Sequence, residues 1–105
     1  MKLTKLLERL EYKVVCGDAD VEVNTLLMDS RKVEAGDVFV CITGAVRDAH
    51  DFVDDVVEKG ARAIIIEKDV DVALASSKNV TVVKVESTRY ALACMAAAFY
   101  GYPAE

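Results

Sequence analysis

The residues best suited to bind a ligand lie in one short segment, residues 28–44, whose sequence is MDSRKVEAGDVFVCITG. The cations Arg31 and Lys32 stand near its beginning, and Arg47 follows shortly after its end at Gly44. The chain carries a formal net charge of −5, which argues against the broad basic surface that nucleic acid requires. A local group of cations can nevertheless oppose the overall charge. The spacing therefore allows a site for one small anionic ligand.

The chemistry that this segment could perform is binding, because the sequence contains no recognisable catalytic set. It has no G-x-G-x-x-G, no G-x-x-x-x-G-K-[ST] and no G-x-S-x-G motif. His50 is followed by Asp51, but neighbouring residues on a helix point about 100° apart and make a poor catalytic pair. With one histidine and three separated cysteines, a zinc site is not expected. We predict no catalytic residues and no metal site in these residues.

Length and composition limit the kind of protein. With 105 residues, 53% of them hydrophobic and 30% charged, the chain is large enough for one core but not for two. No apolar run approaches the ~20 residues that a membrane span needs. Residues 1–13 also lack the continuous apolar stretch of a signal peptide. We therefore predict a single cytoplasmic domain over residues 1–105 that binds neither nucleic acid nor a membrane.

Apolar spacing and turn residues predict the elements that must position the segment. Strands are expected at residues 12–16, 21–28, 38–43, 61–67 and 80–85. Helices are expected at residues 3–10, between about His50 and Gly60, and at residues 88–100, with a short helix or a loop at residues 70–77. Gly60 stands where the C′ residue of a helix belongs, and Ser87 where an N-cap belongs. His50 is interpreted as a helix-start residue without a ligand role.

The second half of the chain alternates strands and helices, which is typical of strands that lie parallel in one sheet. The run ARAIIIE at residues 61–67 does not alternate between apolar and polar residues, so it indicates a strand that is buried on both faces. We therefore predict an α/β fold with a small mixed, partly parallel sheet flanked by helices.

Four pieces of the chain, in this order, resemble the N-terminal, substrate-binding domain of the Mur ligase family. They are residues 28–44 with the D-S-R and G-D-x-F-V motifs, RDAHDF at residues 47–52, VEKGARAIIIE at residues 57–67, and VVKVESTRYALACMAAAFYGYPAE at residues 82–105. The resemblance covers about residues 26–103. The last piece is similar to an R-x-A-L-A-x-x-A-x-x-F-Y-x-x-P stretch in the members that add the third peptide residue.

The resemblance implies a site for the uridine diphosphate (UDP) end of the substrate. By their positions in the family's motifs, the contacting residues are Met28, Ser30, Ala45, Val46 and Arg47, with Arg31 and Gly44 as further candidates. A uracil can lie against an apolar side chain, and a serine hydroxyl can donate to a phosphate or ribose oxygen. An arginine can bind the diphosphate through two hydrogen bonds, and backbone N–H groups after a strand can form an anion-binding concavity.

Each of these side chains also has a plainer interpretation. Ser30 could cap or close the turn that follows it, and Met28 could pack in the core at the end of a strand. Arg31 stands near Asp29 and could form a surface ion pair, which contributes under ~1 kcal/mol. Arg47 could be a solvated loop cation. The sequence alone leaves both interpretations open.

The resemblance further implies a function for a larger enzyme. Such a ligase uses ATP and magnesium to add diaminopimelate or lysine to UDP-N-acetylmuramoyl-L-alanyl-D-glutamate in peptidoglycan synthesis. The central domain, with its G-T-N-G-K-T loop, and the C-terminal domain are not among these residues. This domain is therefore expected to anchor the substrate, with no cofactor of its own and no activity alone. Two alternatives stay open: the same domain of the ligase that adds D-Ala-D-Ala, and a noncatalytic scaffold domain of the same fold.

Overall fold

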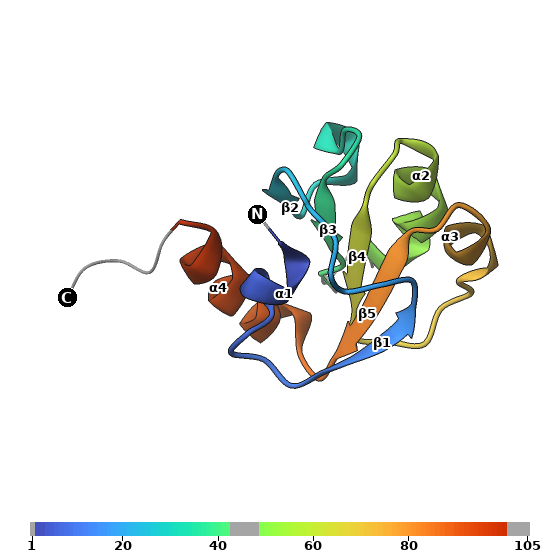
Figure 1. Ribbon diagram of the computed structural model, residues 1–105. Helices are drawn as coiled ribbons and strands as arrows, with labels where there is room; N and C mark the ends of the chain where they lie inside the picture. The colour runs from blue at the N-terminus through green and yellow to red at the C-terminus, as the bar shows by residue number, and fades with distance from the viewer. Residues whose placement is uncertain (1, 43–48, 101–105) are drawn as a thin grey trace.

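Five strands form one mixed sheet at the centre of the protein (Figure 1). The computed structural model describes residues 2–42 and 49–100. The strands are β1 (Tyr12–Cys16), β2 (Leu26–Leu27), β3 (Val38–Val40), β4 (Ala63–Ile66) and β5 (Thr81–Val85), in the spatial order β1-β5-β4-β3-β2. Neighbours from β2 to β5 pair in parallel, and β1 pairs with β5 in the antiparallel direction. The predicted mixed, partly parallel sheet is confirmed.

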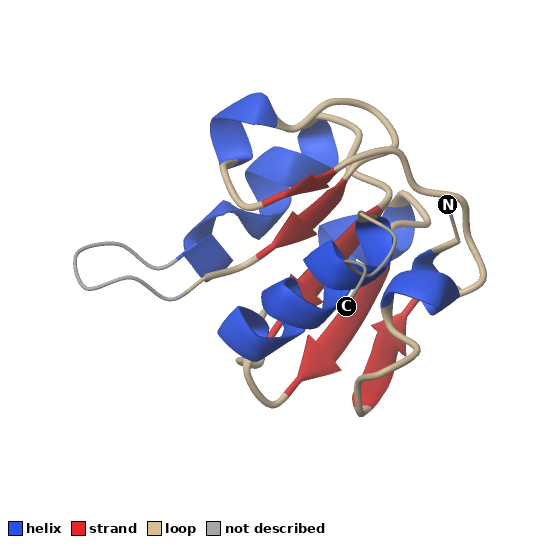
Figure 2. Cartoon of the chain, turned by 90° about the vertical axis from the view of Figure 1, so that its left-hand side faces the viewer, coloured by secondary structure: helices blue, strands red, loops and turns tan. Residues whose placement is uncertain are grey.

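Helices cover both faces of this sheet (Figures 1 and 2). One face is covered by α1 (Leu3–Leu6) and α4 (Thr88–Phe99), and the other by α2 (Val53–Glu58) and α3 (Ala73–Ser77). Two short 3-10 helices, η1 (Ser30–Lys32) and η2 (Ala49–Phe52), precede β3 and α2. The alternation of strands and helices predicted for the second half is therefore confirmed. Residues 70–77, for which either a short helix or a loop was expected, contain the helix α3.

The central strand β4 shows why its sequence does not alternate. All four of its residues are buried. Ala63 and Ile65 belong to the core cluster under α1 and α4, whereas Ile64 and Ile66 belong to the cluster under α2 and α3. Successive side chains of a strand point to opposite faces, and here both faces need apolar residues. The run Ala-Ile-Ile-Ile thus indicates a strand between two layers of helices, as predicted.

The helix predicted at residues 3–10 is wrong in its length. Helix α1 ends at Leu6, and the N–H of Leu7 donates to the Leu3 carbonyl at 3.1 Å as the chain turns away. Leu7 and Leu10 still pack against the core that the helical spacing indicated. The chain must reverse here because β1 begins at Tyr12, on the edge of the sheet.

The strand predicted at residues 21–28 pairs regularly only at β2. Upstream of β2, the N–H of Asn24 donates to the Gly36 carbonyl at 2.8 Å. The N–H of Thr25 donates to the Asp37 carboxylate at 3.2 Å. These donors are bonded to a turn and a side chain, so they are not available to a strand ladder. The strand is shorter than its apolar pattern predicted.

The signals for helix ends are confirmed. Gly60 has φ +95° and follows Lys59, the C-cap residue of α2. The Ser87 side chain accepts a hydrogen bond from the N–H of Tyr90 at the start of α4. The strand predicted at residues 38–43 begins where expected, at β3, and its regular pairing ends at Val40. Local turn and capping chemistry therefore placed the end of α2 and the start of α4 correctly, whereas β3 is shorter than the predicted strand.

Candidate functional site

The segment with the predicted ligand contacts makes a tight turn directly after β2. Asp29 is the N-cap of η1, and its Oδ1 accepts the Arg31 backbone N–H at 3.0 Å. The same carboxylate binds the Arg31 guanidinium through two bonds, Nε to Oδ1 at 3.1 Å and Nη2 to Oδ2 at 3.0 Å. An aspartate that accepts from its own backbone two residues on is a typical turn former. The motif D-S-R thus encodes this turn.

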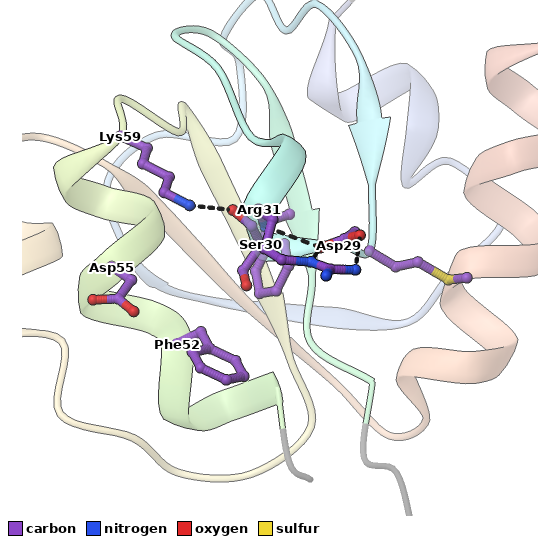
Figure 3. A pocket seen from close by; sticks show the side chains of 8 residues that line it. Asp29, Ser30, Arg31, Phe52, Asp55 and Lys59 are labelled. Carbon is purple, nitrogen blue, oxygen red and sulfur yellow. Dashed lines mark hydrogen bonds and ion pairs between the residues drawn. The ribbon is translucent and has the colours of Figure 1, made fainter.

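A cavity of about 620 Å³ opens between η1 and α2 (Figure 3). It is lined by Met28, Asp29, Ser30, Arg31, Phe39, Phe52, Asp55 and Lys59. Three structural pieces therefore contribute to it: the η1 turn, the buried Phe39 of β3, and the segment that runs from η2 through α2. The volume lies within the range of small-molecule pockets, roughly 300–1,000 Å³. Its walls combine two aromatic rings and a thioether with two cations, two carboxylates and a hydroxyl.

The structure brings three of the predicted contact residues together. Met28, Ser30 and Arg31 all line the cavity. Met28 is 60% exposed, so the plainer interpretation of Met28 as a core residue is wrong. The Ser30 hydroxyl has no hydrogen-bond partner within residues 2–42 and 49–100, so nothing described there competes for it. The other predicted contacts, Gly44, Ala45, Val46 and Arg47, lie outside the described residues.

Arg31 forms a surface ion pair with Asp29, which is one of the two interpretations that the sequence left open. The Arg31 side chain is 87% exposed, and its guanidinium is held by the Asp29 carboxylate. Hydrogen bonds from the Arg31 side chain, and then from its backbone, lower the pKa of Asp29 from 3.8 to about 2. The same bond raises the pKa of Arg31. At neutral pH the pair is therefore fully charged, and each charge is largely neutralised by the other.

Of the five lining residues that were not predicted as ligand contacts, Phe52, Asp55 and Lys59 come from the segment of η2 and α2. They lie on one side of the segment from η2 to the end of α2, at spacings of three and four residues, which places them on one helix face. The Lys59 Nζ donates to the Ser30 carbonyl at 2.7 Å, which joins residues 29 positions apart (Figure 3). The sequence carried no signal for this contact, because it depends on how α2 packs beside η1.

The turn after η1 is held against the end of α2. The Gly36 N–H donates to the Gly60 carbonyl at 2.9 Å. A Cβ added at Gly60 would meet the Ala35 Cα at 3.1 Å, so the two segments touch closely. The buried Asp37 carboxylate also accepts the Glu34 N–H at 2.9 Å. These contacts give the η1 wall of the cavity a defined position relative to α2.

A second group of polar contacts joins the elements at the carboxyl end of β4. The Glu67 carboxylate accepts the backbone N–H of Thr88 at 2.8 Å and its hydroxyl at 2.5 Å. These two bonds lower the pKa of Glu67. The buried His50 accepts the Glu67 N–H on Nε2 at 3.0 Å. His50 lies in η2 near the start of α2, as predicted, and it also ties η2 to the end of β4.

Two absences hold for the part of the chain that the structure describes. No group of three or more His, Cys, Asp or Glu side chains is placed to hold a metal ion there. In the same residues, no helix is both long and apolar enough to span a bilayer.

Comparisons with known proteins relate this chain to the Mur ligases. The model of the "Mur ligase family, catalytic domain" matches residues 22–100. The UDP-N-acetylmuramoyl-L-alanyl-D-glutamate--2,6-diaminopimelate ligase of Clostridium perfringens is 40% identical over 98% of this chain. Ligase 1 of the same name from Clostridium acetobutylicum is 46% identical over 98% of the chain. The alignments cover 20% of either relative, so the chain spans about a fifth of their length.

Solved structures of MurF ligases also match the fold of this chain. MurF from Acinetobacter baumannii superposes with a TM-score of 0.72 at 29% identity, covering 92% of this chain and 20% of that one. MurF ligase from Thermotoga maritima, solved with ADP, gives a TM-score of 0.61 at 34% identity, covering 75% of this chain and 17% of that one.

Proposed function

The chain belongs to the Mur ligase family, and from this premise we propose that it anchors the UDP end of UDP-N-acetylmuramoyl-L-alanyl-D-glutamate. The cavity between η1 and α2 is the proposed binding site. The proposed larger enzyme is an amide-bond-forming ligase that adds a third amino acid to this substrate; the curated relatives are named as ligases of UDP-N-acetylmuramoyl-L-alanyl-D-glutamate and 2,6-diaminopimelate. The chain spans about a fifth of their length, so we assign it a part of that activity.

The observation that carries the proposal is the convergence of Met28, Ser30 and Arg31 on one cavity. A nucleotide needs an apolar surface for its base, donors for ribose and phosphate oxygens, and positive charge near the diphosphate. Met28 and Phe52 supply the apolar surface, Ser30 supplies a free hydroxyl, and Arg31 supplies a guanidinium. Gly44, Ala45, Val46 and Arg47 stay predicted contacts of the same ligand.

We assign the chemical step to other parts of the ligase. The sequence contains neither of the standard phosphate-binding loop motifs, G-x-x-x-x-G-K-[ST] and G-x-G-x-x-G, that would cradle the phosphates of ATP. We propose that a central domain and a C-terminal domain of the full enzyme hold ATP and magnesium and select the incoming amino acid. Holding the remote end of a long substrate raises the rate only through orientation of the reacting carboxyl, which can contribute several kcal/mol.

A second candidate is the same domain of the ligase that adds D-Ala-D-Ala. The solved MurF structures favour it at 27–34% identity. The curated diaminopimelate ligases are 35–46% identical over 98–100% of the chain, which favours the third-residue enzyme. Both candidates use a UDP-linked substrate, so the proposed cavity serves either.

The experiment is an amide-shift NMR titration of the protein with UDP. We expect shifts at Met28, Ser30, Arg31, Phe52 and Lys59. Ser30→Ala should weaken UDP binding about 2- to 10-fold, the usual effect of one neutral hydrogen bond. Ser76→Ala, which removes an exposed hydroxyl on α3, is the matched control and should leave binding unchanged. No response at millimolar UDP, or shifts confined to another surface, would favour the noncatalytic scaffold and exclude this site.

A further inference from the structure

We infer that Lys59 binds the diphosphate of the nucleotide and that this lysine, not Arg31, supplies the charge that distinguishes a nucleoside diphosphate from a nucleoside. The inference rests on the proposed function, because it assumes a nucleotide in the cavity between η1 and α2. It adds a residue and a binding orientation that neither the motifs nor the relatives' names assign.

The Lys59 ammonium lies at the η1 wall of the cavity. Lys59 is the C-cap residue of α2, and its side chain reaches across to the Ser30 carbonyl, 2.7 Å from Nζ (Figure 3). An ammonium has three N–H donors. One is used by the carbonyl, and no carboxylate in the described part of the chain pairs with Lys59. Two donors on a cavity-lining cation thus remain for a ligand.

Arg31 differs from Lys59 in the charge of its partner. Both cations line the cavity, but Asp29 already binds the Arg31 guanidinium through two bonds. A diphosphate that approached Arg31 would meet the negative charge of Asp29 at the same place. Lys59 has a neutral carbonyl oxygen as its partner, so its charge is not compensated in this way. Asp55, one turn earlier on α2, also lines the cavity but forms no ion pair with Lys59.

Hydrogen-bond donors and an aromatic ring lie at different ends of the cavity. Lys59 contacts the same serine whose hydroxyl faces the cavity, so an ammonium and a hydroxyl meet on one wall. Phe52 lies at the other end of α2, where it is the last residue of η2 and the N-cap of α2 (Figure 3). The anionic end of the ligand therefore points to the C-terminal end of α2. The base lies toward the aromatic ring of Phe52.

The test compares UDP with uridine, which lacks phosphate, by calorimetric or NMR titration of the protein. Lys59→Gln should weaken UDP binding about 10-fold or more, the usual effect of losing a charge-assisted hydrogen bond, and change uridine binding less than about 2-fold. Lys59→Arg should keep most of the preference for UDP. Lys32→Gln is the matched control: it removes the same charge from exposed η1, outside the cavity lining, and should leave both affinities unchanged.

The outcomes separate this inference from the proposed function. If Lys59→Gln weakens UDP and uridine equally, Lys59 only holds η1 in place and the inference is overturned. An unchanged UDP affinity in Lys59→Gln overturns it as well, and both results leave the proposed nucleotide site intact. A wild-type protein that binds neither compound would reject the proposed function and this inference together. Unfolding curves of each variant show whether a loss of affinity comes from a loss of fold.

Discussion

At the scale of single residues, the Asp29–Arg31 pair decides which charges of the cavity are free. Its geometry is bidentate, and the carboxylate also caps η1, so one side chain both shapes the turn and neutralises the neighbouring cation. The pair is near the surface, where ion pairs contribute little to stability. Its main effect is therefore on the electrostatics of the cavity wall.

The pKa of Asp29 tests this arrangement. In the native protein, the carboxyl 13C shift should titrate with a midpoint of about 2. In Arg31→Gln the midpoint should rise toward the ordinary 3.8 but stay below it, because the backbone N–H of residue 31 still donates. The pKa is lowered on folding, so the stabilisation is present above about pH 3.8 and is lost as the pH falls through 2.

The matched control for this titration is Arg62→Gln, which removes an exposed arginine that does not line the cavity. It should leave the Asp29 midpoint unchanged. A midpoint near 3.8 in the wild type would mean that the two side chains do not pair in solution.

At the scale of elements, the start of α4 is fixed by a side chain from the end of β4. The Glu67 carboxylate accepts both the N–H and the hydroxyl of the buried Thr88, while the Ser87 side chain accepts the N–H of Tyr90. The first N–H groups of a helix have no partner within the helix. Two of them are satisfied here, one by a local cap and one by a residue 21 positions away.

Removing the Thr88 hydroxyl should measurably destabilise the protein. Thr88→Val keeps the shape of the side chain but removes one bond to a charged group, which should lower the free energy of unfolding by about 1–3 kcal/mol. The pKa of Glu67 should rise, because its first cause of lowering is lost. A lowered pKa stabilises the fold above the ordinary 4.5, so the difference between variant and wild type should shrink as the pH falls below that value.

Thr25→Val, at an exposed threonine, is the control for the same denaturation measurement and should change stability by no more than about 0.5 kcal/mol. If Thr88→Val is as stable as this control, the Glu67 contact does not persist in solution.

At the scale of the whole molecule, the sheet divides the apolar core into two clusters. One lies under α1 and α4 and the other under α2 and α3, and neighbouring residues of β4 contribute to opposite clusters. The cavity opens on the side of α2, where Phe39 from the sheet forms part of its lining. Packing of α2 on the sheet therefore fixes both the core and the distance between the two walls of the site.

Truncation of either face of β4 should be equally severe. Ile64→Ala and Ile65→Ala should each lower the free energy of unfolding by about 2–5 kcal/mol, measured by chemical denaturation, because each removes a fully buried side chain from a packed cluster. Val14→Ala on the edge strand β1, where the side chain is 38% exposed, is the control and should cost less. A small effect at one of the two isoleucines would mean that one face of the sheet is not covered by helices.

Much of the fold was predictable because it is encoded over a few neighbouring residues. The unalternating run at β4, the cap at Ser87 and the glycine after α2 are local signals, and each one is confirmed. The predicted strand at residues 21–28 was too long, because N–H groups before β2 bond to a turn and to Asp37, and these partners lie about twelve residues further along the chain. Apolar spacing predicts which side chains are buried, but it does not say which backbone groups pair.

The sequence by itself determined the family, the α/β sheet and the D-S-R turn with Met28 and Ser30, since these depend on short motifs and local periodicity. Only the tertiary structure decided that Phe52, Asp55 and Lys59 face this turn. The reason is physical: the position of α2 on the sheet results from many weak packing contacts between residues that are distant in the sequence. No short motif can therefore predict it.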